Sequence, residues 1–292
     1  MTNYLYKETG LEFLIELNNN LKESTKTFYN ENYDSNRVDY TPFMSFKLKN
    51  QFADIQKLID LNYEKGGLIT SKKSLNEIHS FFLNEGSSLT LGMPVIYEDW
   101  PVMTDIEKTR IDAISSFREG KALLKNSPFL FELYKNLIEF VIPLDRERPS
   151  GFDNQTLRGV ILRTFPKGRS GLLAGFQLAH AMGHHVALML ESIDPIYKSD
   201  KFEIIEYSVR NDKRTVQHAF VSSVALSYMA ILAKDIYGSG NEYFIADEHI
   251  RSYSNYIPDA VASAVESINK SKSKFTDFGL KLLLELEEIG QI

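Results

Sequence analysis

Apolar residues recur every three or four positions through most of the chain, which is the spacing of one face of an α-helix. This rhythm predicts helices over residues 11–29, 44–67, 104–126, 127–142, 171–192 and 213–237. Two boundaries carry end signals: Thr104 and Glu107 form a capping box, and Gly66 and Gly67 end the second predicted helix. The pattern therefore indicates a mainly helical protein.

Three segments do not follow the helical rhythm and are candidates for strands or extended loops. They cover residues 87–103, 157–168 and 201–212, where apolar residues cluster or alternate. We therefore expect a mainly α protein of α+β character, a bundle-like domain of many helices with a few short strands. Residues 1–145 form a helical half that is a candidate for substrate recognition, and residues 146–292 carry two long His-bearing helices. We expect the two halves to pack as one compact unit.

Composition narrows the function classes. The 292 residues carry a formal net charge of −6 with dispersed Lys and Arg, so we expect no nucleic-acid partner. There is no cysteine, which leaves His, Asp and Glu as the ligands for any metal ion. The N-terminus has no signal-peptide pattern, and uninterrupted apolar runs are far shorter than the roughly 20 residues of a membrane span. We expect a soluble cytoplasmic protein with no membrane partner.

The stretch "LAHAMGHHVAL" (178–188) holds three of the six histidines. His180 and His184 are four residues apart, so a helix places both on one face, about 6 Å apart at Cβ, where they could share a metal ion. His185 points about 100° away and is not expected to be a ligand. The alternative is that all three are histidines of a core helix, which is an expensive environment for imidazoles without partners.

A third imidazole and two cations follow in the next predicted helix and the segment before it. His218 lies 34 residues after His184, and a helix–strand–helix hairpin can bring two such helices together. Arg210 and Arg214 lie just ahead of it, and an Arg side chain can bind a carboxylate with two parallel hydrogen bonds. The alternative is that both arginines lie on the surface at a helix start.

Ala181 occupies the position at which zinc hydrolases carry the glutamate that activates water. A methyl group cannot act as a base, so hydrolysis by that route is disfavoured. Glu191 lies about two turns beyond His184 and is poorly placed to replace this base. Glu203 or Glu206 could supply a carboxylate from another segment. Two or three imidazole ligands with open positions also suit non-haem Fe(II), which needs no such glutamate.

Three segments together resemble the HExxH-motif proteins found with ribosomally made peptide natural products, a group that includes 2-oxoglutarate-dependent peptide β-hydroxylases. They are "GFDNQTLRGVILRTF", "LAGFQLAHAMGHHVALMLESIDPIY" and "YSVRNDKRTVQHAFVSSVALSYM", between residues 150 and 237. The resemblance implies Fe(II) held by His180, His184 and His218, with 2-oxoglutarate held by one of Arg210 and Arg214. The chain departs from the family in Ala181, in Val209 where the family has Trp, and in a short spacing from Arg214 to His218.

Together with the histidine pair, His218 and the two arginines, this resemblance implies an Fe(II)/2-oxoglutarate-dependent oxygenase that uses O₂ to hydroxylate a side chain of a precursor peptide. A second hypothesis is a non-catalytic protein that binds a peptide or a partner and has lost the metal chemistry. A zinc hydrolase is the third and is disfavoured by Ala181. A di-iron carboxylate protein is also disfavoured, because the sequence lacks paired Glu-x-x-His motifs.

Overall fold

The computed structural model describes residues 3–33, 64–71, 73–76, 106–144, 151–152, 159–165, 171–198 and 200–291. It is mainly helical with a few short strands in two small sheets, which confirms the predicted fold class. The chain divides into two compact units, and each unit takes segments from both halves of the sequence. Of the predicted elements, the strand at 87–103, most of the helix at 44–67 and the cap at Thr104 lie outside the described residues.

The second unit, residues 16–118 and 134–171, is built around a small sheet. The strands follow the order β1 (Gly67–Leu68), β2 (Phe140–Leu144), β4 (Val160–Thr164) and β3 (Gly151–Phe152). β2 pairs in parallel with β1 and β4, and β3 pairs with β4 in the antiparallel sense. β4 confirms the strand expected within 157–168. Every residue of β2 and β4 is buried, as expected for central strands of a parallel sheet.

The predicted helix over 127–142 is wrong in its second part. The helix α5 (Pro128–Leu137) ends before a run of apolar residues that forms β2 instead. A continuous apolar run does not distinguish a buried strand from a buried helix by its spacing, and here pairing on both sides decides for the strand. Two other helices lie where the sequence predicts them, α1 (Lys7–Tyr33) and α4 (Ile106–Leu124). Each has residues assigned to both units.

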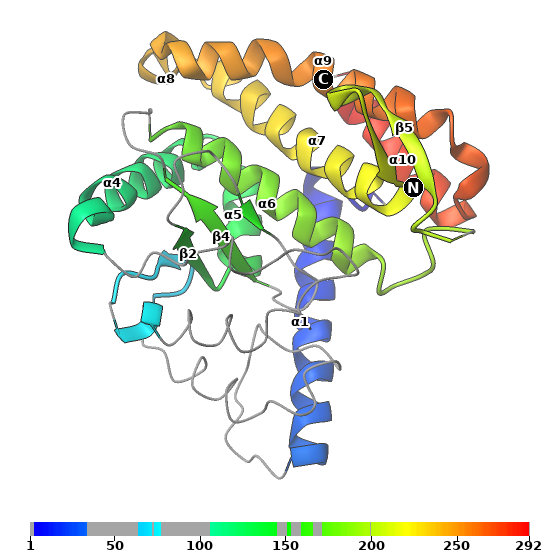
Figure 1. Cartoon of the computed structure of the whole chain (residues 1–292), viewed down its shortest axis with the longest axis horizontal. Helices are drawn as coiled ribbons and strands as arrows, with labels where there is room; N and C mark the ends of the chain where they lie inside the picture. The colour runs from blue at the N-terminus through cyan, green and yellow to red at the C-terminus, as the bar shows by residue number, and fades with distance from the viewer. Residues whose placement is uncertain are drawn as a thin grey trace. The chain divides into compact units, whose positions relative to one another are not determined.

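The first unit, residues 1–15, 119–133 and 172–292, is a helical assembly. Its long helices are α6 (Leu173–Leu190), α7 (Val216–Gly238), α9 (Glu248–Asn269) and α10 (Asp277–Gly290), with the short α8 (Glu242–Ala246) between α7 and α9. α7 packs against α6, α9 and α10, and α6, α7 and α9 run side by side in Figure 1. α7 is therefore the central helix of this unit.

By length and composition alone, α7 could cross a membrane. Its polar residues interrupt every apolar run, which is why the run lengths did not reveal this. Most of the apolar stretch is buried within the protein.

A two-stranded hairpin connects α6 to α7. β5 (Ile204–Tyr207) pairs with β6 (Asp212–Thr215) in the antiparallel sense, and the 3-10 turn η3 (Ser208–Arg210) joins them. β5 confirms the strand expected within 201–212. The helix expected from Lys213 begins three residues later because Lys213, Arg214 and Thr215 extend β6. The Thr215 hydroxyl then accepts a hydrogen bond from the His218 backbone N–H (3.1 Å) and caps α7.

Candidate metal site

His180 and His184 lie beside each other on α6. Their ring centroids are 4.6 Å apart and the ring planes are inclined by 38°. Both side chains are half-buried, as is Gln177 one turn earlier on the same stripe of the helix. The i,i+4 spacing predicted this proximity, and the pair forms the geometric basis of the candidate site.

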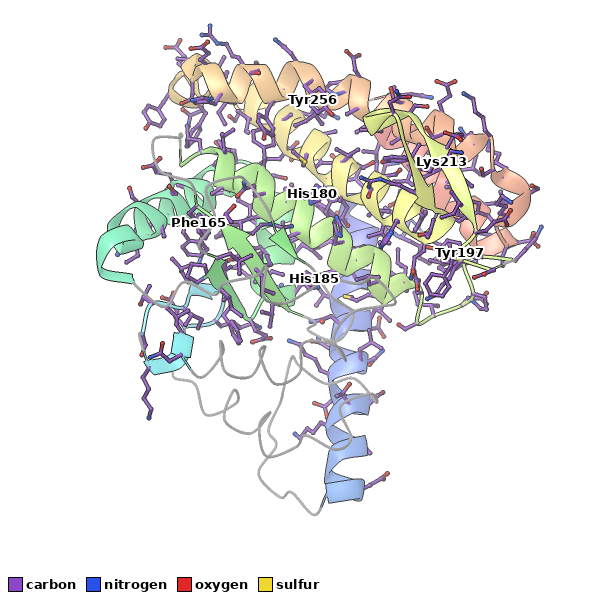
Figure 2. The ribbon with its side chains drawn as sticks, in the orientation of Figure 1. Phe165, His180, His185, Tyr197, Lys213 and Tyr256 are labelled. Atoms are coloured by element: carbon purple, nitrogen blue, oxygen red, sulfur yellow. The ribbon has the colours of Figure 1, made fainter. Side chains whose placement is uncertain are left out.

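The neighbouring positions of α6 face inward. His185 is 4% exposed and Ala181 is fully buried, so the stripe of the histidine pair is bounded by core positions. Figure 2 shows His180 and His185 on different sides of α6. The prediction that His185 points away from the pair is consistent with this view, and its burial identifies it as an interior residue.

His218 is not gathered with the pair. Among the described residues, no group of three or more His, Asp or Glu side chains is placed to hold one metal ion. The reason lies in the register of two antiparallel helices. A Cβ atom at Gly183 would stand 2.5 Å from Ala225 Cα, so the helices touch there, beside His184. His218 precedes Ala225 by seven residues, which is about 10.5 Å along the axis of α7.

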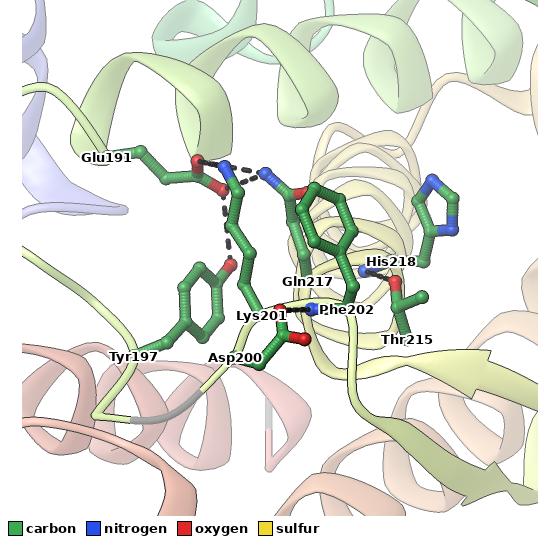
Figure 3. A network of polar contacts seen from close by, with 8 residues as sticks. All are labelled: Glu191, Tyr197, Asp200, Lys201, Phe202, Thr215, Gln217 and His218. Carbon is green, nitrogen blue, oxygen red and sulfur yellow. Dashed lines mark hydrogen bonds and ion pairs between the residues drawn. The ribbon is translucent and has the colours of Figure 1, made fainter. Parts of the chain in front are cut away.

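The end of α6 confirms this register. Glu191, eight residues after Gly183, accepts two hydrogen bonds from the Nε2 of Gln217, eight residues before Ala225, at 2.7 and 2.9 Å. Its carboxylate also accepts a hydrogen bond from the Tyr197 hydroxyl (3.2 Å) and pairs with Lys201 (3.3 Å). Figure 3 shows these groups around Glu191, with the His218 ring directed away from them.

The network at Glu191 was not predicted from the sequence. The burial of Tyr197 raises the pKa of its hydroxyl well above the usual value, and the adjacent Glu191 carboxylate raises it further. One sequence signal was present, because an acidic residue at a helix C-terminus is unfavourable without cationic or donor partners. Through these contacts, Glu191 connects the end of α6 with the following loop and with α7.

Arg214 and His218 form a second, separate cluster at the start of α7. The Arg214 Nη1 donates a hydrogen bond to the Ser222 hydroxyl (2.7 Å), and its guanidinium carbon lies 4.9 Å from the centroid of the Tyr207 ring. Burial lowers the pKa of His218, and the positive charge of Arg214 lowers it further. Arg210 ends the turn η3, and its side chain lies outside the described set.

The other candidate carboxylates have partners of their own. Glu203 pairs with Lys274, and Glu206 pairs with Lys213 (3.3 Å) on the exposed surface of the hairpin. Among the described residues, neither joins the histidine pair in a metal-binding group. His249 lies exposed in the first turn of α9, and His79 lies outside the described residues.

The donor set can be compared with what Fe(II) and 2-oxoglutarate need. Two adjacent imidazoles fit two positions of a transition-metal ion and leave the others open. The described residues do not complete a three-ligand site, and Arg214 lies with His218 rather than with the pair. The described residues therefore fit a metal site with two histidine ligands.

Comparison of the chain with protein-family models and with curated proteins gives no match in either case.

Proposed function

We propose that the protein binds a divalent transition-metal ion through His180 and His184. The observation that supports this is the half-buried ring pair, with centroids 4.6 Å apart on one face of a well-packed helix. Packing of α6 against α7 fixes the two backbone positions in advance, which lowers the entropy cost of bringing both imidazoles to one ion. Neutral imidazole is a good ligand for iron, cobalt, nickel, copper and zinc.

We further propose that this ion is Fe(II) in an oxygenase that acts with 2-oxoglutarate and O₂ on a ribosomally made precursor peptide in the cytoplasm. The support is the resemblance of residues 150–237 together with Ala181, which removes the base that hydrolysis needs. When bound, such an ion supplies O₂ activation. The roles proposed for this chain's own residues are ligation by His180 and His184 and, from the second cluster, anion binding by Arg214.

Metal binding is tested with untagged protein stripped of metal and titrated with Co(II), and anaerobically with Fe(II), by calorimetry and visible absorption. One ion per chain is expected, with affinity reduced at least about tenfold in His180→Ala and in His184→Ala because each variant loses half of the chelate. His249→Ala, an exposed histidine, is the matched control and should bind as the wild type does. Equal binding by all variants contradicts the proposed site.

The titration of His218→Ala separates two forms of the proposal. Unchanged affinity supports the two-histidine site, and a loss equal to that of His180→Ala means that His218 joins the pair when metal binds. Metal-dependent formation of succinate from 2-oxoglutarate then tests the oxygenase assignment. Metal binding without succinate formation would support the proposed metal site and contradict the oxygenase assignment.

The second candidate function is a non-catalytic protein that binds a peptide or a partner. Two observations favour it: Ala181 is fully buried, and the helix register places His218 about 10.5 Å along α7 from the level of Gly183. Metal content of the purified protein, measured by elemental analysis, distinguishes the candidates. Precursor-peptide binding that survives complete metal removal and the double variant His180→Ala/His184→Ala supports this second function.

A further inference from the structure

The N-terminal segment 3–6 is held on the first unit through its backbone. The backbone N–H of Tyr4 donates to both carboxylate oxygens of Glu285 in α10, at 3.0 and 2.8 Å, and the N–H of Leu5 donates to Oε2 at 2.8 Å. On the other side of the segment, the Tyr228 hydroxyl of α7 donates to the Leu5 carbonyl oxygen (3.0 Å). Two successive peptide units are thus bound by two side chains from helices more than 220 residues away.

Side-chain packing holds the same segment. The Tyr4 ring makes edge contacts with Phe13 and Phe278, at centroid distances of 5.1 and 5.4 Å, and Tyr6 makes one with Phe129 at 5.3 Å. The Leu5 side chain is fully buried. The segment therefore closes over Glu285, which is 9% exposed.

The carboxylate of Glu285 has no cation in ion-pair contact within the described residues. Lys7 pairs with Glu288 (3.4 Å) rather than with Glu285, and the negative charge of Glu288 is itself unfavourable to a second carboxylate nearby. Tyr228 is fully buried and cannot ionise in the neutral range, because burial and the Glu285 charge both raise the pKa of its hydroxyl well above the usual value. The backbone N–H groups of Tyr4 and Leu5 favour the ionised form of Glu285, but they offset only part of the unfavourable effect of burial.

We propose that Glu285 and the segment 3–6 form a pH-sensitive clamp, in which the segment is held most firmly when Glu285 is protonated and is released more readily once it ionises. The hydrogen-bond geometry accommodates the neutral form. A proton on Oε1 displaces only the longest of the three bonds (3.0 Å), while Oε2 still accepts both 2.8 Å bonds. Release of the segment opens Glu285 to water, which stabilises the charged form.

The direction follows from the two states of the carboxyl. Burial raises the pKa of Glu285 in the closed clamp from 4.5 to about 7, with the charge of Glu288 adding to the rise and the backbone N–H groups and Lys7 opposing it. In the open clamp the pKa returns towards its ordinary value. Protonation therefore favours closure: the clamp is tightest below pH 4.5, weakens as the pH rises to about 7, and changes little above that.

The clamp is tested by hydrogen exchange at the Tyr4 and Leu5 amides, with selective ¹⁵N labelling and rates divided by the intrinsic rate at each pH. Protection in the wild type should fall by the order of a hundredfold between pH 4.5 and 7 and then level off. Glu285→Gln stays neutral and should show no such slope. Amides of Val224 and Ala225 in the core of α7 report any global unfolding.

Two further variants make the result specific. Glu287→Gln, in the same helix but paired with Lys272 and Asn269, should keep the wild-type slope. Tyr228→Phe removes the bond to the Leu5 carbonyl, so exchange should be faster at every pH with the slope retained. Flat protection in the wild type, the same slope in Glu285→Gln, or loss of the slope in Glu287→Gln or Tyr228→Phe overturns the proposal.

Discussion

Gly183 of α6 and Ala225 of α7 lie in backbone contact, and a Cβ atom at position 183 would stand 2.5 Å from Ala225 Cα and 2.9 Å from Ala225 N. No side-chain rotation relieves contacts with backbone atoms. The absence of a side chain at Gly183 is therefore what allows the two central helices to approach. It also sets the level of α7 that lies beside His184.

Gly183→Ala should force α6 and α7 apart. The gain of about 1 kcal/mol in helix propensity is outweighed by the overpacking, and we expect a net loss of about 1–3 kcal/mol in the free energy of unfolding. Gly238→Ala is the matched control, because Gly238 is the last residue of α7 and a Cβ there would contact nothing within 4 Å. Urea unfolding measures both, and equal stability of the two variants contradicts the close-contact explanation.

The Glu191 network should contribute more to stability than an exposed ion pair. Gln217 is 5% exposed, and its amide loses both hydrogen bonds to the carboxylate in Glu191→Ala, so we expect a loss of about 1–3 kcal/mol in the free energy of unfolding. Glu206→Ala removes the solvent-exposed pair with Lys213 and should cost no more than about 1 kcal/mol. Similar unfolding midpoints in urea for these two variants would show that the network is not a stabilising tie.

Local pattern accounts for the elements that the sequence predicted correctly. β4 and β5 follow from short apolar segments bounded by polar or turn residues, and α6 follows from its apolar periodicity. β2 was missed because an apolar run reads equally as helix or strand until its partners on either side are known. β6 was missed because its polar residues become a strand only by pairing with β5.

In the candidate site, too, the sequence predicted what depends on one helix and not what depends on the packing of two helices. The proximity of His180 and His184 is a local property of one helix, and the prediction that they lie together is confirmed. The position of His218 depends on the register between two helices, which a glycine contact at Gly183 determines. That contact has no signature in the spacing of histidines, so the sequence alone could not show how far His218 lies from the pair.

The charge of Arg214 should control the protonation of His218. Burial is the larger cause of the lowered pKa of His218 and the Arg214 charge is the second, so Arg214→Met should raise the His218 pKa while leaving it below 6.5. NMR titration of the His218 ring protons measures this. Lys213→Met removes an exposed charge from the same strand and should leave the titration unchanged.

The same residue gives a pH dependence of stability with a defined sign. Because the pKa of His218 is lower in the folded state than in the unfolded one, protonation favours unfolding, and stability is lost as the pH falls below 6.5. Arg214→Met should reduce the part of this loss that comes from His218. A His218 pKa that does not move in Arg214→Met would mean that the cluster is not electrostatically coupled.

A glutamate at position 181 should destabilise the protein rather than create a hydrolase. Ala181 is fully buried, so Ala181→Glu places a carboxyl in the core and should cost at least about 2 kcal/mol. Burial raises the pKa of such a carboxyl, so the deficit should be larger at pH 8 than at pH 5. Gln177→Glu adds the same group on the half-buried stripe of α6 and is the control, with little effect expected at either pH. An Ala181→Glu variant of wild-type stability, measured by urea unfolding, would contradict this account, because α6 would then have room for a water-activating carboxylate beside the histidine pair.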